Sequence, residues 1–291
     1  MKLLSFLNGG KESWGAVVGD SVVDLGKATS GNYAGLQDFI ASPDFAQREK
    51  IVAGRQGDAA LSQIQFLPVI PRPEKIICLV RNYLDHHQEV LAAGMQRELS
   101  KFPPIFLRVW RSQIGHGQPI IRPKVSNELD WEAELAVIIG KAGRHIPEEA
   151  AMDHIAGYSC YNDVSVREWQ FHAKQIAAGK NFVGTGPFGP WMVTVDEIPD
   201  PTNLKLELRI NGKTEQSSNT KHLIFRIPTI ISYCSAIFDL SPGDVLVTGT
   251  PAGVGWSRKP PKFLKAGDTV EVEIEGIGIL RNSVIDEVIT S

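Results

Sequence analysis

The chain has 291 residues, 43% of them hydrophobic and 22% charged, and a formal net charge of -3 at pH 7. This composition is typical of a soluble globular protein, and the small charge gives no electrostatic reason to expect nucleic acid or an anionic membrane as a partner. No apolar run is long enough to span a bilayer, and the three cysteines form no C-x-x-C pair, which is typical of a reducing compartment. We therefore expect a cytoplasmic protein, and the length favours one large domain and one smaller one.

The first seventy residues predict a small N-terminal domain that mixes strands and helices. Three short strands are expected, at Lys2–Phe6, Ser13–Val18 and Ser21–Leu25. The polar region from Leu36 to Gln63 has apolar residues at helical spacing. The segment Leu67–Pro73 contains three prolines, which suit neither a helix interior nor a central strand. We place a domain boundary there, which gives an N-terminal domain of residues 1–70 and a second domain of residues 71–291.

A candidate acid–base pair follows the predicted buried strand Lys75–Val80. A helix is expected from Leu84 to about Met95, and it would place His86 and Glu89, three residues apart, on one face. A carboxylate that holds an imidazole allows the histidine to act as a base. The same spacing is more often found in a solvated pair on a helix surface.

The motif L-D-W-E-A-E-L-A-V-I-I-G is the strongest candidate for a ligand site. Its apolar run, Leu135–Ile139, predicts a buried strand, and Glu132 and Glu134 would share one face at the entrance to this strand. Two glutamates at this spacing are by themselves typical of the solvated face of an edge strand. Beside a buried strand they need a counter-charge, which a hard divalent cation would supply. Asp163, after the predicted strand Ile155–Cys160, offers a third oxygen, and oxygen ligands favour Mg²⁺, Mn²⁺ or Ca²⁺ over Zn²⁺.

The rest of the chain predicts alternating strands, turns and helices. The expected elements are a strand at Pro103–Trp110, helices at Val164–Ala178 and Ile224–Phe238, a loop at Gly184–Pro190, and a hairpin at Leu204–Gln216 with its turn at Asn211-Gly212. The segment Ser241–Gly255 predicts a turn, a short buried strand and a glycine-rich loop that lacks the Gly-Lys-Ser/Thr ending of a phosphate loop. Alternating apolar residues near the C-terminus predict closing antiparallel strands.

Seven segments resemble, in order, the successive motifs of the fumarylacetoacetate hydrolase superfamily. They are Lys75–Glu89, Leu129–Lys141, Gly157–Gln170, Gly179–Pro190, Asn211–Phe225, Leu240–Gly255 and Leu264–Asn282. The first seventy residues resemble the small N-terminal domain that many members carry. The resemblance implies an α+β fold that is predominantly β, in which a mixed β-roll with flanking helices forms the catalytic domain. It also implies a homodimer.

The resemblance further implies the residues of an active site. A divalent metal, Mg²⁺ or Mn²⁺, is implied, and its matching ligands are Glu132, Glu134 and Asp163. The other matching positions are catalytic or contact the substrate: His86 and Glu89 as a dyad that activates water, Lys180, which helps to hold the substrate, and Gln170 and Thr250.

Two positions depart from the family pattern. The lysine often found in the strand before the acidic motif is Arg108 here, and the usual glycine-leucine before the Asn-Tyr pair is Val80-Arg81. A guanidinium group presents a planar fork that suits carboxylates. We predict that Arg108 or Arg81 shapes the pocket for a compact or doubly acidic substrate. The alternative is that these are surface arginines outside the site.

The implied reaction is the hydrolysis of a C–C bond in an acylpyruvate or a related diketo acid. The metal would stabilise an enolate leaving group while His86 activates water, and the products would be pyruvate or another 2-oxo acid and a carboxylic acid. The same framework supports oxaloacetate decarboxylation and hydratase or isomerase reactions of 2-oxo acids in aromatic or sugar-acid catabolism. The presence of both His86 and Glu89 favours hydrolysis, because decarboxylation needs no base. A metal-stabilised binding protein without turnover is the alternative from another class.

Overall fold

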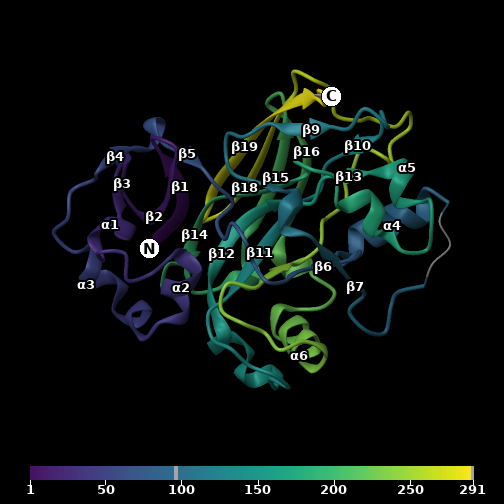
Figure 1. The fold of residues 1–291 in the computed structure, drawn as a ribbon. Helices are drawn as coiled ribbons and strands as arrows, with labels where there is room; N and C mark the ends of the chain where they lie inside the picture. Colours follow the sequence, from purple (N-terminus) through teal and green to yellow (C-terminus); the bar gives the residue numbers. More distant parts are fainter. Residues whose placement is uncertain (95–97, 290–291) are drawn as a thin grey trace.

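The computed structural model describes residues 1–94 and 98–289 and is built around two sheets (Figure 1). The spatial order of the main strands in the 12-stranded sheet is β4 (Ala59–Ala60), β3 (Ser21–Asp24), β2 (Lys11–Val18), β1 (Lys2–Asn8), β14 (Gly186–Thr194), β12 (Ile155–Asn162), β11 (Ala133–Ile139), β17 (Val245–Val247), β6 (Ile76–Leu79) and β7 (Ile105–Arg108). Two short strands join this sheet at its side, β5 (Gln65–Phe66) next to β1 and β8 (Gln113–Ile114) next to β14.

The second sheet is smaller and is also mixed. Its five strands, in spatial order, are β16 (Lys213–Asn219), β15 (Lys205–Ile210), β18 (Thr269–Ile274), β19 (Gly278–Asp286) and β9 (Ile120–Arg122). A separate two-stranded pair joins β10 (Leu129–Asp130) to β13 (Ser165–Val166). The α-helices are α1 (Leu25–Ala28), α2 (Leu36–Ala41), α3 (Arg48–Val52), α4 (Leu84–Ala92), α5 (Arg167–Gln170) and α6 (Ile227–Ile237). None of the helices that the structure describes is both long and apolar enough to cross a bilayer.

Strand β11 is buried along its whole length because both faces of the large sheet are covered. Leu135 and Val137 lie in a core that also contains residues of β15, β18 and α6. Ala136 and Ile138 point to the other face, where they join a core with residues of α2. A strand covered on both faces is expected to be continuously apolar, so the fold accounts for the unbroken run of this motif.

Most of the predicted elements are confirmed. The fold is α+β and predominantly β, and α4, α6, the strand β11 and the closing pair β18–β19 form where the sequence predicts them. The predicted hairpin is β15–β16, and its turn residues Asn211 and Gly212 have φ angles of 51° and 78°, as a tight hairpin turn requires. The expected helical position Met95 lies outside the described residues.

Three predictions of local structure are wrong in whole or in part. The expected loop Gly184–Pro190 overlaps β14, a central strand paired with β1 and β12. The expected helix Val164–Ala178 is interrupted: α5 has four residues, and a 3₁₀ turn forms at Ile176–Lys180. The region from Leu36 to Gln63 contains the short α-helices α2 and α3 with a 3₁₀ helix, Pro43–Gln47, between them, and the chain returns to the sheet at β4.

The first seventy residues form a lobe at one side of the molecule (Figure 1). Their strand β1 pairs antiparallel with β14, so strand pairing crosses the predicted boundary at residue 70. The division into two domains stays a prediction. The candidate functional residues lie towards the opposite end of the large sheet, where β12, β11, β17 and β6 are neighbours in this order.

Candidate active site

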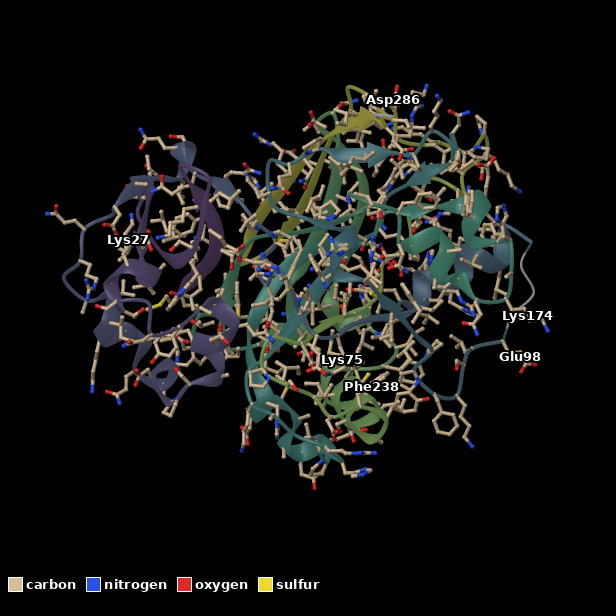
Figure 2. The ribbon with its side chains drawn as sticks, viewed as in Figure 1. Lys27, Lys75, Glu98, Lys174, Phe238 and Asp286 are labelled. Carbon is tan, nitrogen blue, oxygen red and sulfur yellow. The ribbon has the colours of Figure 1, made fainter. Side chains whose placement is uncertain are left out.

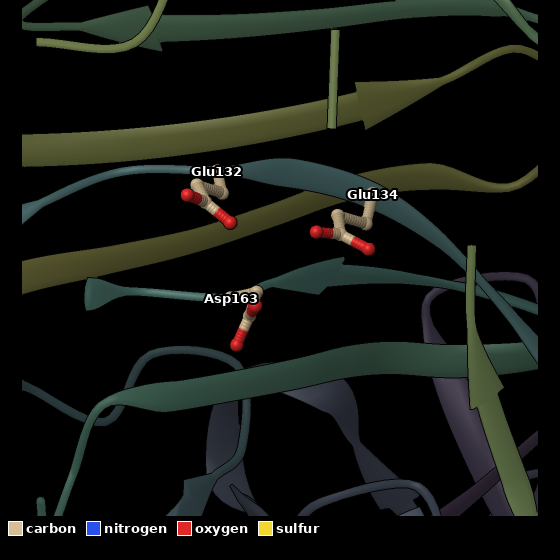
Figure 3. Close-up of side chains that lie close together, drawn as sticks. All are labelled: Glu132, Glu134 and Asp163. Carbon is tan, nitrogen blue, oxygen red and sulfur yellow. The ribbon is translucent and has the colours of Figure 1, made fainter. Parts of the chain in front are cut away.

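Three carboxylates meet where β11 begins and β12 ends. Glu132 directly precedes β11, Glu134 is its second residue, and Asp163 directly follows β12. The antiparallel register pairs Ala133 with Asn162, so the backbone N–H of Asp163 reaches the carbonyl oxygen of Glu132 at 2.9 Å. Figure 3 shows Glu132 and Glu134 next to each other, with Asp163 on the neighbouring segment. Each residue offers an oxygen within 4.8 Å of the other two, and we call this group the acidic triad.

Buried cations neutralise two members of the acidic triad. The Lys180 ammonium lies 2.7 Å from Glu132 Oε2 and 2.6 Å from Asp163 Oδ2. Arg167 Nη1 lies 2.7 Å from Glu132 Oε1, and the Arg108 guanidinium contacts the Asp163 carboxylate. Burial by itself would raise the pKa of Glu132, but the charges of Lys180 and Arg167 outweigh it and lower this pKa to about 2. Glu132 is therefore a carboxylate at neutral pH.

Glu134 is the member of the triad that no salt bridge between described residues neutralises. Its carboxylate accepts a hydrogen bond from the backbone N–H of Gly249. Burial, and then the charges of Asp163 and Glu132, raise the pKa of Glu134 well above its ordinary value. A divalent cation among these hard oxygen ligands would supply the missing positive charge. The donor set and its charge thus fit a metal ion of the Mg²⁺ or Mn²⁺ type.

His86 and Glu89 form the pair that the sequence predicts on one face of α4. His86 Nδ1 lies 2.9 Å from Glu89 Oε2, and Glu89 Oε1 accepts the backbone N–H of Gly253 at 2.9 Å. Burial would raise the pKa of Glu89, but the hydrogen bonds from His86 and its other partners lower it overall. The carboxylate therefore stays ionised and fixes the orientation of the imidazole.

Glu132 and Glu134 of the acidic triad and His86 of the His86–Glu89 pair line one pocket. Its empty space, together with open solvent at its mouth, is about 770 Å³. The charged and polar side chains in its lining are Arg81, His86, Glu132, Glu134, Arg167, Gln170, Lys174, Lys180 and Thr250. The apolar wall includes Phe106, Val90, Val254 and Trp256. The pocket is large enough for a small acid, and cations dominate its charged lining.

The predicted substrate-binding residues do not all line the pocket. Arg81, Gln170 and Thr250 line the pocket, whereas Arg108 lies against Asp163, 4% exposed, and is not among the lining residues of the described chain. The Gln170 side-chain oxygen accepts a hydrogen bond from Arg167 at 2.8 Å. The Thr250 hydroxyl donates to a backbone carbonyl of β11 at 3.0 Å. Arg108 is thus positioned to orient Asp163, a candidate metal ligand, and only Arg81 of the two arginines lines the pocket.

Asp130 is a site residue that the sequence reasoning missed. It is fully buried, and it accepts hydrogen bonds from Arg167 Nε at 2.8 Å and from the backbone N–H groups of Gly255 at 2.7 Å and Trp256 at 2.9 Å. Because Arg167 also contacts Glu132, Asp130 joins the acidic triad to the loop of residues 248–256. The sequence feature that could have identified Asp130 is its position as a third acidic residue, two residues before Glu132, in the same buried motif.

We expect Asp130→Asn to lower the affinity for Mn²⁺ by roughly 10-fold, within the range seen when a residue that orients a metal ligand is lost. The amide keeps an oxygen for the Gly255 N–H, but it loses the oxygen that accepts the Trp256 N–H and the charge that holds Arg167. Isothermal titration with Mn²⁺, with the Tm of the metal-free protein, measures the effect. The control is Asp239→Asn, at an exposed ion pair. Unchanged Mn²⁺ affinity in Asp130→Asn would contradict this role.

The fold and the site define a class of protein. Residues 75–285 match the family model described as fumarylacetoacetate (FAA) hydrolase C-terminal, and the chain belongs to this family. The resemblance seen in the sequence motifs is confirmed.

Particular relatives are enzymes. The chain is 41% identical over 271 residues to oxaloacetate tautomerase fahd2, mitochondrial, of Xenopus laevis, which covers 92% of this chain and 83% of that protein. The crystal structure of a putative HpcE protein from Mycobacterium smegmatis aligns with a TM-score of 0.88 and 34% identity, over 99% of this chain and 100% of that one. Maleylpyruvate hydrolase from Sphingobium sp. SYK-6, in complex with manganese(II) and pyruvate, aligns with a TM-score of 0.81 and 30% identity, over the same shares. The Xenopus relative is named as mitochondrial, so the cytoplasmic location expected for this chain stays a prediction.

Proposed function

We propose that this protein is a metal-dependent enzyme that interconverts the enol and keto forms of a small 2-oxo acid, with oxaloacetate as the first candidate. The observation that carries the proposal is the pocket lined by His86, Glu132 and Glu134, with Glu89 next to His86 and Asp163 next to the two glutamates. The choice of reaction is supported by the oxaloacetate tautomerase of Xenopus laevis, which is more similar to this chain than the maleylpyruvate hydrolase structure is. The predicted small-molecule substrate and homodimer are part of this proposal.

Glu132, Glu134 and Asp163 would hold the metal. When bound, Mg²⁺ or Mn²⁺ supplies a Lewis acid that chelates the 2-oxo acid and stabilises negative charge on its keto oxygen. Lys180 and Arg167 keep Glu132 ionised, and they limit its movement through contacts of 2.7 Å. The site is therefore arranged before the substrate arrives, which reduces the free energy spent on ordering it.

His86 is the group that moves the proton. Its contact with Glu89 assigns a proton to Nδ1, which leaves Nε2 as the acceptor. Nε2 takes a proton from the carbon next to the keto group, so that a C–H bond breaks and an enolate forms. The protonated His86 then gives this proton to the enolate oxygen, which completes the enol and regenerates the base, and the reverse steps give the ketone. The reaction needs no protein nucleophile.

Hydrolysis of an acylpyruvate is the second candidate function. The same His86–Glu89 pair is suited to take a proton from water, and the structure of a maleylpyruvate hydrolase aligns with the whole chain. In this reaction water adds to the distal carbonyl, the C–C bond breaks, and pyruvate and a carboxylic acid are released. The hydrolase differs from the tautomerase in requiring room for water next to the distal carbonyl.

The test uses the protein loaded with Mn²⁺ or Mg²⁺ and two substrates, freshly prepared enol oxaloacetate and an acylpyruvate. Enol absorbance is followed directly, and pyruvate is measured with a coupled assay. We expect faster loss of the enol signal without pyruvate formation. Pyruvate release from the acylpyruvate, without enol conversion, would replace the proposal with the hydrolase. Pyruvate release from oxaloacetate would replace it with a decarboxylase, and no catalysis in either assay would contradict both enzyme proposals.

A further inference from the structure

Glu215 is a buried acidic residue outside the acidic triad. Charged side chains such as those of Lys27 and Lys174 project from the surface of the molecule (Figure 2), whereas the side chain of Glu215, on β16, is fully buried. Two cations pair with its carboxylate: the Arg258 guanidinium contacts it, and the Lys262 ammonium lies 2.5 Å away. A buried ion pair is weak evidence for stability, because taking the charges out of water offsets their attraction. The contacts of these cations therefore indicate what the cluster does.

Arg258 connects Glu215 to the loop that follows β17. Its Nη2 donates hydrogen bonds to the backbone carbonyl oxygens of Gly253 at 2.9 Å and of Glu215 at 3.0 Å, while its Nη1 contacts the Glu215 carboxylate. The indole N–H of Trp131 donates to the same Gly253 carbonyl at 3.1 Å. The guanidinium carbon of Arg258 lies 5.5 Å from the centre of the Trp131 ring. The Arg258 side chain is thus held between β16 and the loop, and it fixes the carbonyl group of Gly253.

Gly253 is the residue at which the loop contacts both β16 and the His86–Glu89 pair. A Cβ on Gly253 would lie 2.3 Å from the backbone oxygen of Glu215, and its φ angle of 104° favours glycine. Its N–H donates to Glu89 Oε1 at 2.9 Å, and the other oxygen of this carboxylate contacts His86 Nδ1. The Ser257 hydroxyl, from the residue before Arg258, also hydrogen-bonds to Glu89. The orientation of the Glu89 carboxylate therefore depends on where this loop is held.

We propose, building on the function proposed above, that Arg258 is a positioning residue for the proton transfer by His86. Arg258 is held by Glu215 and fixes Gly253 in place. The N–H of Gly253 then holds the Glu89 carboxylate in the orientation that keeps a proton on His86 Nδ1. Arg258 and Glu215 are not among the described residues that line the pocket, so Arg258 acts through the loop and not on the substrate.

Matched variants at Arg258 and Lys262 test this role. Both side chains pair with Glu215 and lie over the Trp131 ring. The Lys262 ammonium donates to the Glu215 carboxylate, whereas Arg258 also donates to the carbonyl of Gly253. Arg258→Met and Lys262→Met each remove one cation from Glu215 and keep an unbranched apolar chain over the ring. Arg258→Lys keeps the charge without the paired donors, and it tests the role if Arg258→Met does not fold.

The first measurement is the ring tautomer of His86, observed by ¹⁵N NMR of the Mg²⁺-loaded protein without substrate. Mg²⁺ is diamagnetic, alkaline pH keeps a histidine ring neutral, and the signals of His86 are identified by their absence in His86→Gln. We expect a single tautomer with the proton on Nδ1 in the wild-type protein and in Lys262→Met. In both Arg258 variants the signals of the two ring nitrogens should shift toward those of a tautomer mixture, because Glu89 is no longer held.

The second measurement is the kinetics of enol conversion. Arg258→Met should lower kcat by roughly 3- to 30-fold, as for loss of one hydrogen bond that serves a charged group, and KM should stay within about twofold. In the Glu89→Ala protein the same substitution should have no further effect on kcat, because Arg258 acts through Glu89. Lys262→Met should keep the wild-type kcat.

Four results would overturn this role: a tautomer mixture in the wild-type protein, an unchanged tautomer in the Arg258 variants, an equal change in Lys262→Met, or additive effects of Arg258→Met and Glu89→Ala on kcat. The proposed function is tested separately, because the tautomer is measured without substrate. A protein that does not convert the enol, yet loses the Nδ1 tautomer only in the Arg258 variants, would overturn the tautomerase and leave the role of Arg258 in holding Glu89 standing.

Discussion

Replacing Glu134 with glutamine is expected to lower the affinity for Mn²⁺ by at least about 100-fold and to abolish activity without unfolding the protein. Glutamine keeps the size of the side chain, and its amide oxygen still accepts the Gly249 N–H that Glu134 accepts now. It removes the one charge of the acidic triad that no salt bridge between described residues neutralises. Mn²⁺ titration followed by electron paramagnetic resonance measures the affinity, and thermal unfolding of the metal-free variant measures the fold.

The matched control is Glu275→Gln, which changes an exposed glutamate in the turn between β18 and β19. We expect it to bind Mn²⁺ like the wild-type protein. If Glu134→Gln also bound Mn²⁺ normally, the acidic triad would be a salt-bridge cluster held by Lys180 and the two arginines, and the metal would have to bind elsewhere. The metal-free Tm of Glu134→Gln should be equal to or above that of the wild-type protein, because folding raises the pKa of Glu134 and therefore costs free energy at neutral pH that glutamine does not cost.

Replacing His86 with alanine is expected to lower kcat by roughly 10²- to 10⁴-fold, the range for loss of a general base. Mn²⁺ affinity should stay within about twofold, because the side-chain hydrogen bond of His86 is to Glu89, outside the acidic triad. Glu89→Gln should have a smaller effect in the same direction, since the amide still orients the ring but does not stabilise its protonated form. The measurements are steady-state kinetics with saturating Mn²⁺ and a parallel metal titration.

His87→Ala supplies the control, because His87 is also buried on α4 but does not line the active-site pocket. Normal kcat in His86→Ala would mean that another group moves the proton. Loss of Mn²⁺ binding in the same variant would instead make His86 a metal ligand.

Local sequence patterns predict those parts of the fold whose conformation depends on the residues of the element itself. The Asn211-Gly212 turn needs positive φ angles that these residues provide, and the apolar run of β11 suits a strand covered on both faces. Gly184–Pro190 was mistaken for a loop because its glycines serve the packing of a strand. A Cβ on Gly186 would lie 2.8 Å from the Tyr161 hydroxyl and 3.2 Å from Arg108 Nη2. Partners supplied by β12 and β1 therefore outweigh the local preference of this segment.

In the candidate site, too, the sequence predicts what neighbouring elements decide and does not predict what distant segments supply. The acidic triad could be predicted because its members sit at strand ends that antiparallel pairing brings together. Their counter-charges could not, because Lys180, Arg167 and Arg108 come from three other segments, and only the tertiary structure shows that they leave Glu134 unneutralised. Asp130 was missed for the same reason, since two of its donors are backbone groups of the loop after β17.

The position of β17 between β11 and β6 also has a consequence for the order in which the protein folds. Residues 245–247 pair parallel with residues 76–78, and the pocket needs both the helix that follows β6 and the loop that follows β17. Contacts so distant in the chain carry a large loop-closure cost and form slowly. During synthesis the pocket is completed only when the last third of the chain has emerged from the ribosome. Binding of a small acid to this pocket during refolding would therefore report the closing step of folding.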